Sequence, residues 1–276
     1  MGDHSTGQGF GSILCSGKSQ GLTGQIIFLP EDREKEEQKI RLFSRPNEDD
    51  KIINGYTCYK NSVPYQVSLR VAGRHYCGGA LIEDGWVLTS AQCYQNNIQV
   101  VLGEHDISTH EGPEMSIDVY RIFMHPEFDE HTLDNDIMLI KLVRRISLNS
   151  YVRTVSLPSL CAGAATTCLV SGWGNTVPSD AYYPAYTLQC LESPTVSGND
   201  CSKYYPGRLT HNMFCAGRVG KFTTCKGDEG GPLVCQGQLQ GIVSWGNQCD
   251  AQRNNPWVYT KVCNYIYWIK DIISHN

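Results

Sequence analysis

The chain has 276 residues, of which 41% are hydrophobic and 18% are charged, so it can bury the core of one large domain or two small ones. The formal net charge of -5 and the absence of a lysine- and arginine-rich run argue against a nucleic-acid partner. No stretch approaches the ~20 apolar residues that a membrane-spanning helix needs, so we expect no membrane partner.

The thirteen cysteines indicate disulfides formed in an oxidising compartment, because no two of them have the Cys-x-x-Cys spacing of zinc or redox sites. Cys15 stands apart from the other cysteines, which lie between Cys58 and Cys263, and we expect it to be unpaired. The N-terminus lacks a basic start followed by an apolar run, which conflicts with export. Either a signal peptide is missing from this sequence, or the product is never exported.

The first 51 residues differ in amino-acid composition from the remainder of the chain. Residues 1–24 are rich in glycine and serine, and residues 31–51 are dense in charge. Such compositions are typical of flexible or processed segments. We therefore expect a disordered, propeptide-like N-terminal extension over 1–51 and a folded domain over 52–276.

Short β-type runs separated by turn residues follow, for example 65–69, 98–102 and 241–245, and they predict an all-β fold. The end of the chain is different, because apolar residues recur there at helical spacing and would form one buried stripe. These residues are Tyr265, Trp268, Ile269, Ile272 and Ile273. The pattern predicts one amphipathic C-terminal helix.

Four segments in chain order carry a family resemblance: Ile52-Ile53-Asn54-Gly55, Leu88-Thr89-Ser90-Ala91-Gln92-Cys93, residues 134–142, and Gly227-Asp228-Glu229-Gly230-Gly231-Pro232. Together they resemble the signatures of trypsin-like (chymotrypsin-family) serine proteases, above all pancreatic trypsinogens, and the resemblance covers essentially all of residues 48–276. It implies two antiparallel six-stranded β-barrels with the active site between them, followed by the C-terminal helix.

The resemblance also implies a disulfide pairing that spacing alone could not select. The implied pairs are Cys58 with Cys190, Cys77 with Cys93, Cys161 with Cys263, Cys168 with Cys235, Cys201 with Cys215, and Cys225 with Cys249.

Two of the three catalytic positions implied by the resemblance are replaced. Acyl transfer in this family needs a serine hydroxyl, an imidazole and an orienting carboxylate. Asp136 matches the carboxylate, but Gln92 stands at the histidine position and Glu229 at the serine position. An amide cannot accept a proton near neutral pH, and a carboxylate at position 229 places negative charge near Gly227, the oxyanion-hole position. These replacements predict a pseudoprotease that is not an enzyme.

A different catalytic set is the alternative. Asp136 and Glu229 formally resemble the carboxylate pair of a glycosidase or an aspartic protease, but no flanking sequence supports a sugar site or a shared proton. We expect instead that the Gln92 amide donates a hydrogen bond to Asp136 and satisfies that buried acceptor.

The specificity pocket implied by the resemblance comprises Thr223, Ser244, Gly246 and Trp257. Trypsins have an aspartate at the position of Thr223, so the charge that selects lysine or arginine is missing. Trp257 stands where the family has a glycine, and its indole is expected to fill or close the pocket. The alternative is that insertions near Asp250 move Trp257 outward.

Glu48-Asp49-Asp50-Lys51 before Ile52 resembles the activation site of trypsinogens, and Asp228 matches the aspartate that captures the new N-terminal amine. The alternative reading of the acidic run is an ordinary solvated segment. Its position directly before Ile52 favours the activation reading.

Residues 104–114 resemble the calcium loop of trypsins. The implied ligands are three carboxylates and two main-chain carbonyls, and calcium prefers six to eight such oxygens. They belong to Glu104, Asp106, Thr109, Glu111 and Glu114. The alternative is an ordinary acidic surface loop.

Three function classes follow. The favoured hypothesis is a secreted, monomeric pseudoprotease that binds or regulates a protease, a protease inhibitor or a receptor. The second is a trypsin-family serine endopeptidase, as the overall resemblance suggests. The third is a decayed trypsin duplicate without function.

Overall fold

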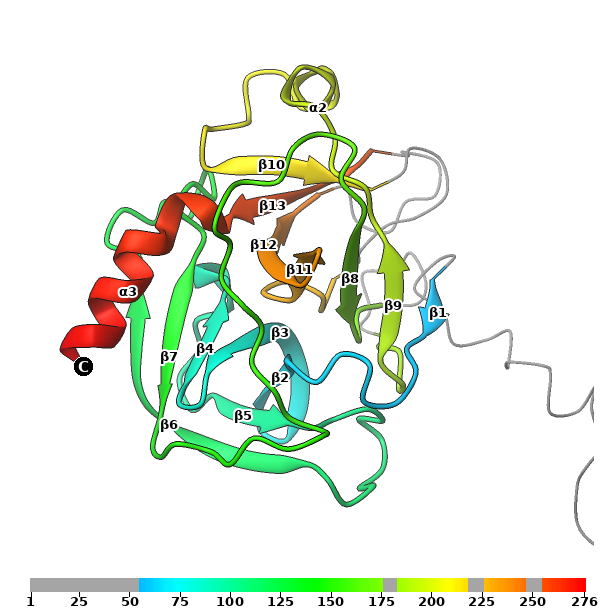
Figure 1. Ribbon diagram of the computed structural model, residues 1–276, viewed down its shortest axis with the longest axis vertical. Coiled ribbons are helices and arrows are strands. Elements are labelled where there is room, and N and C mark those ends of the chain that lie inside the picture. Colours follow the sequence, from blue (N-terminus) through cyan, green and yellow to red (C-terminus); the bar gives the residue numbers. More distant parts are fainter. Residues whose placement is uncertain (1–54, 176–182, 218–225, 247–254) are drawn as a thin grey trace, which may run out of the picture. The chain divides into compact units, whose positions relative to one another are not determined.

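The computed structural model describes residues 55–175, 183–217, 226–246 and 255–276 (Figure 1). The chain divides into two compact units, Met1–Asn47 and Glu48–Asn276. The first unit and the whole of the expected extension over 1–51 lie outside the described residues. Within the described ranges, no helix has the length and apolar character needed to cross a bilayer.

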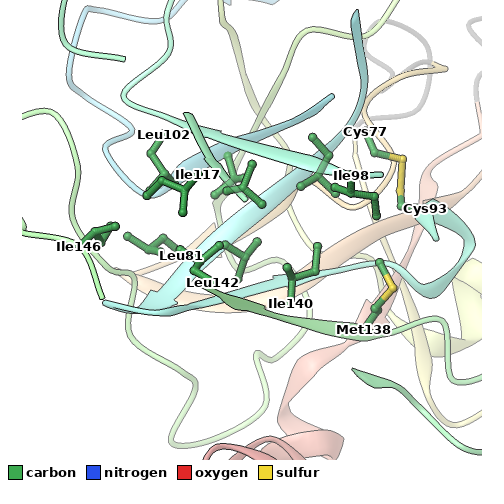
Figure 2. Packing of buried hydrophobic residues seen from close by; sticks show 14 of the residues in the cluster. Cys77, Leu81, Cys93, Ile98, Leu102, Ile117, Met138, Ile140, Leu142 and Ile146 are labelled. Atoms are coloured by element: carbon green, nitrogen blue, oxygen red, sulfur yellow. A yellow bond between two sulfur atoms is a disulfide. The ribbon is translucent and has the colours of Figure 1, made fainter. Parts of the chain in front are cut away.

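Six antiparallel strands form a closed barrel in the order β2-β3-β4-β7-β6-β5. Their sequences are rich in Val, Ile and Leu, whose branched side chains pack well on a pleated surface. The strands are β2 (Gln66–Val71), β3 (Arg74–Glu83), β4 (Trp86–Thr89), β5 (Gln99–Leu102), β6 (Met115–Met124) and β7 (Met138–Leu142). Figure 2 shows the barrel core, where Leu81, Leu102, Ile117 and Ile140 lie in one buried cluster.

A second antiparallel sheet has seven strands in the order β1-β9-β8-β11-β12-β13-β10. It consists of β1 (Tyr56–Thr57), β8 (Cys168–Gly172), β9 (Gln189–Glu192), β10 (Met213–Ala216), β11 (Pro232–Cys235), β12 (Gln238–Trp245) and β13 (Trp257–Lys261). Its core includes Val170, Leu233, Val243 and Tyr259. The predicted all-β, trypsin-like fold and its first six-stranded barrel are confirmed. The second β-system differs from the expected six-stranded barrel, because the described residues form a seven-stranded sheet there.

Helices are short and few in the described ranges. They are η1 (Ala91–Cys93), α2 (Gly198–Tyr204), η2 (Val262–Tyr265) and α3 (Ile266–His275). The predicted C-terminal helix is confirmed by α3, drawn in red in Figure 1. Its Ile269 is fully buried in a cluster that contains Leu139 of the barrel and Leu239 of the second sheet, so α3 packs on both β-systems.

Five of the six expected disulfides are present: Cys58–Cys190, Cys77–Cys93, Cys161–Cys263, Cys168–Cys235 and Cys201–Cys215. The cysteines of the sixth, Cys225 and Cys249, lie outside the described residues, as does Cys15.

Glycines let the barrel and the second sheet approach each other closely. A Cβ atom on Gly78 of β3 would lie 2.8 Å from the Gly231 Cα, and one on Gly230 would lie 2.2 Å from the Thr89 Oγ1. Gly230 also has a φ of +78°, a conformation that favours glycine. The Gly78 N–H donates to the Glu229 carbonyl at 2.8 Å. The segment that carries Glu229 is therefore fixed against the wall of the barrel.

Candidate active site

The three positions that the resemblance assigns to the catalytic triad lie at the junction of the two β-systems. Gln92 is in η1, Asp136 lies two residues before β7, and Glu229 lies three residues before β11. Gln92 and Asp136 are in hydrogen-bond contact. The Glu229 segment runs beside Cys93, since a Cβ atom on Gly230 would lie 3.2 Å from the Cys93 sulfur.

Asp136 is fully buried and surrounded by donors. Its Oδ1 accepts from the Gln92 backbone N–H at 2.9 Å, and its Oδ2 accepts from the Ser244 hydroxyl at 2.6 Å. Burial raises the pKa of Asp136, whereas the hydrogen bonds from Ser244, Gln92 and Ser90 lower it. The network thus stabilises a carboxylate in a position that water does not reach.

Gln92 supplies the side-chain donor that was expected. Its Nε2 donates to Asp136 Oδ2 at 2.6 Å and to the Ser244 carbonyl at 2.8 Å, so both amide hydrogens have acceptors. The prediction that the Gln92 amide satisfies Asp136 is confirmed. This amide positions the aspartate, but it has no nitrogen that could take a proton near neutral pH.

Glu229 folds back onto its own loop. Its Oε2 accepts from the Gly227 N–H at 2.6 Å, and Gly227 has a φ of +99°. Burial is the largest cause that raises the pKa of Glu229 to about 7; the nearby Asp228 raises it further, and the Gly227 N–H and Lys226 oppose the rise. The carboxylate therefore occupies the backbone donor that the resemblance assigns to the oxyanion hole.

Asp228, the expected partner of the activated N-terminus, is buried against the second sheet. Its Oδ1 accepts from the Gly174 N–H at 2.9 Å, and a Cβ atom on Gly172 would collide with the same carboxylate. Lys51 and Ile52 lie outside the described residues, so the activation step stays a prediction.

Trp257, which the resemblance places in the specificity pocket, is buried in the fold. It is 3% exposed, and a Cβ atom on Gly246 would lie 2.7 Å from its ring. The outward position considered as an alternative is therefore wrong. The Ser244 hydroxyl donates to the Asp136 carboxylate. Thr223 lies outside the described residues.

Sequence reasoning missed His75, which is buried beside the site. Its Nδ1 lies 2.8 Å from the Ser68 hydroxyl and its Nε2 lies 3.1 Å from the Gly227 carbonyl. Burial lowers the pKa of His75 to about 4, so the ring is neutral at physiological pH. No motif marks this histidine, and the only signal was a histidine near the start of a strand that continues with mostly apolar residues.

The expected calcium ligands stay together in one loop. Among the residues that the structure describes, no three His, Cys, Asp or Glu side chains are arranged to hold a metal ion. The carboxylates of Glu104, Glu111 and Glu114 instead contact other groups of the protein.

Comparisons with known proteins agree with this architecture. A family model described as Trypsin matches residues 52–269. The chain is 57% identical to Trypsin-3 of Salmo salar over 231 residues, covering 83% of this chain and 96% of that protein. It is 56% identical to Trypsin of Sus scrofa and to Anionic trypsin of Bos taurus, over 83% of this chain in each case and over 99% and 92% of those proteins.

These comparisons contradict the prediction that the chain is not an enzyme. Each of these relatives is named a trypsin, and more than half of the aligned residues are identical, which points to a peptidase. The identity is a property of the whole domain, whereas the prediction rested on two positions, Gln92 and Glu229.

Proposed function

Because the chain belongs to the trypsin family of serine proteases, we propose that it acts as an endopeptidase on polypeptide chains bound beside Asp136 and Glu229. The observation that carries this proposal is the identity to trypsins over the whole domain. The hydrogen bonds around the buried Asp136, at the junction of the two β-systems, are consistent with an active site at that place.

Hydrolysis by this chain must use the groups that are present, and position 229 has no hydroxyl. A carboxylate with a pKa of about 7, such as Glu229, is suited to act as a general base near neutral pH. In the proposed reaction Glu229 takes a proton from a water molecule whose oxygen attacks the peptide carbonyl carbon. The same proton then passes to the leaving amine as the C–N bond breaks. Protonated Glu229 also releases the Gly227 N–H to donate to the carbonyl oxygen.

The test measures new α-amino groups released from an unfolded polypeptide by the purified chain cleaved after Lys51, between pH 5 and 9. We expect slow hydrolysis that rises as Glu229 ionises through pH 7 and is lost in Glu229→Gln. A fluorophosphonate reagent should leave this activity intact, because it reacts with an activated serine.

Two results would count against the proposal. Hydrolysis that resists Glu229→Gln but disappears with the fluorophosphonate would come from a contaminating serine protease. A rate for the parent chain no higher than that of Glu229→Gln would exclude the proposed role of Glu229.

A second candidate function, a binding or regulatory role, is favoured by the contact between the Glu229 carboxylate and the Gly227 N–H, which already occupies a donor of the site. The partner would be a protease, a protease inhibitor or a receptor that contacts the same cleft. Calorimetric titration with a protein inhibitor of trypsin tests this candidate. Binding that is unchanged in Glu229→Ala would argue against recognition at this site.

We also propose that the protein is exported, since the five disulfides of the described residues are typical of an oxidising compartment. Recovery of the disulfide-bonded chain from the medium of expressing cells tests this. The calcium expected at residues 104–114 is not part of the proposal, because the carboxylates there have partners of their own.

A further inference from the structure

The acidic loop over residues 104–114 contains a buried ion pair. Arg70 Nη2 donates to Glu104 Oε2, and the two side chains are 20% and 2% exposed. Arg70 lies in β2, and Glu104 follows a turn at Gly103, whose φ is +71°. A guanidinium keeps its charge at every accessible pH, so the Glu104 carboxylate faces a permanent cation.

The other carboxylates of the loop are also engaged. The Lys60 ammonium lies 2.5 Å from Glu111 Oε1. Glu114 accepts from the backbone N–H groups of Glu111 and Gly112 at 2.5 and 2.7 Å and lies 2.9 Å from His110 Nδ1. Asp106 Oδ1 accepts from the Ser108 N–H at 2.9 Å and from its hydroxyl at 2.6 Å.

Calcium needs about six to eight oxygen ligands at roughly 2.3–2.6 Å, and acidic side chains supply the charge that offsets its own. In this loop one oxygen of the buried carboxylate faces a guanidinium, and Lys60 adds a second positive charge at Glu111. Only Glu104 Oε1 is buried without a hydrogen-bond partner among the loop carboxylates described, and it is one ligand, not a set. A divalent ion bound by Glu104 would meet the Arg70 guanidinium, and the exposed Lys60 ammonium would compete with it for Glu111. The residues therefore do not fit calcium.

We propose that Arg70 is the resident cation of the loop over residues 104–114 and takes the place of the calcium ion that the family resemblance implies. The guanidinium holds Glu104 from within the fold, so the loop keeps its conformation without a metal. The consequence is a trypsin-family domain whose stability does not depend on calcium.

The test is the melting temperature of the whole chain in 1 mM EDTA and in 10 mM calcium chloride, at constant ionic strength. The parent should change by less than about 1 °C, because ligand that does not bind the folded state does not stabilise it. Arg70→Gln removes the cation and leaves the carboxylates. It should gain a calcium-dependent rise of roughly 5–10 °C once calcium exceeds its Kd by about a hundredfold. Arg74→Gln removes an exposed charge from the same hairpin and should behave like the parent.

A parent that calcium stabilises, with the effect lost in Glu104→Gln, would overturn the proposal. An Arg70→Gln variant that folds but stays indifferent to calcium would also overturn it, because Arg70 would then not be what stands in for the metal. Should Arg70→Gln fail to fold, calorimetric titration of the parent with calcium is the deciding measurement. Heat of calcium binding that is lost in Glu104→Gln would contradict the proposal, and the absence of binding heat would support it.

Discussion

The carboxyl group of Glu229 should destabilise the folded domain at neutral and alkaline pH, and Glu229→Gln should remove that cost. Gln is nearly isosteric, and its carbonyl oxygen can still accept from the Gly227 N–H. The pKa of Glu229 rises from its ordinary 4.5 to about 7 in the fold, mainly through burial. Because a tenfold change in an ionisation constant is worth about 1.4 kcal/mol, ionised Glu229 lowers the free energy of unfolding by roughly 3 kcal/mol.

The sign of the pH dependence follows from the raised pKa. Below pH 4.5 the group is protonated in both the folded and the unfolded chain, so the parent and Glu229→Gln should be about equally stable. Between pH 4.5 and 7 the unfolded chain loses the proton first, and the stability of the parent falls. Above pH 7 the difference should be constant at about 3 kcal/mol in favour of Glu229→Gln, or roughly 6–12 °C in melting temperature.

Urea unfolding with the disulfides intact, followed by fluorescence at pH 4 and pH 8, measures this difference. Glu192→Gln, which removes an exposed carboxylate at the end of β9, is the matched control and should change stability by less than about 0.5 kcal/mol at both pH values. A Glu229→Gln variant that is equally stable as the parent at pH 8, or less stable, would refute the reasoning.

Three further outcomes are expected. Gln92→Ala should lower the free energy of unfolding by about 1.5–3 kcal/mol in urea titrations, because the buried carboxylate of Asp136 loses a charge-assisted hydrogen bond; a loss below about 0.5 kcal/mol would contradict that role. Trp257→Ala should cost about 3–5 kcal/mol in the same assay, since it leaves a cavity beside Gly246; an unchanged midpoint would show that the indole is not part of the core. Peptide mapping without reduction should recover Cys225 linked to Cys249, and either cysteine found alkylated would contradict the implied pairing.

Much of the fold could be predicted because it is encoded locally. The stripe from Tyr265 to Ile273 repeats at helical spacing within a single segment, and all of it after Tyr265 lies in α3. The positions of Gln92 and Glu229 could be located because each lies inside a short motif of fixed order. The contact of the Gln92 amide with Asp136 followed from elementary chemistry, since a buried carboxylate needs donors.

The features that escaped prediction depend on residues far apart in the sequence. His75 contacts Gly227, which is 152 residues away, and no local pattern marks either as a partner. Arg70 and Glu104 are 34 residues apart, and the acidic loop by itself resembles a metal site. The sequence of the acidic loop shows the negative charges of its own carboxylates. The positive charge that Glu104 contacts belongs to Arg70 of β2, which only folding brings near the loop.

Gln92 and Glu229, at the positions that the resemblance assigns to the catalytic histidine and serine, are both held by the fold around them. Gln92 and Glu229 each engage hydrogen-bonding groups that the architecture already provides, Asp136 in one case and the Gly227 N–H in the other. A domain more than half identical to trypsins therefore accommodates both side chains, each through a hydrogen bond to a neighbouring group of the protein.

Measuring both the stability and the hydrolysis rate of Glu229→Gln in one preparation distinguishes a catalytic role of the Glu229 carboxylate from a binding role. A gain in stability with loss of hydrolysis would mean that the fold retains a costly carboxylate because the reaction uses it, a relation common at functional sites. A gain in stability with unchanged hydrolysis would show that Glu229 takes no part in the reaction, and it would favour a binding role for the protein. Because the two measurements depend on different properties of one carboxylate, they can disagree, and the disagreement would itself identify which role Glu229 has.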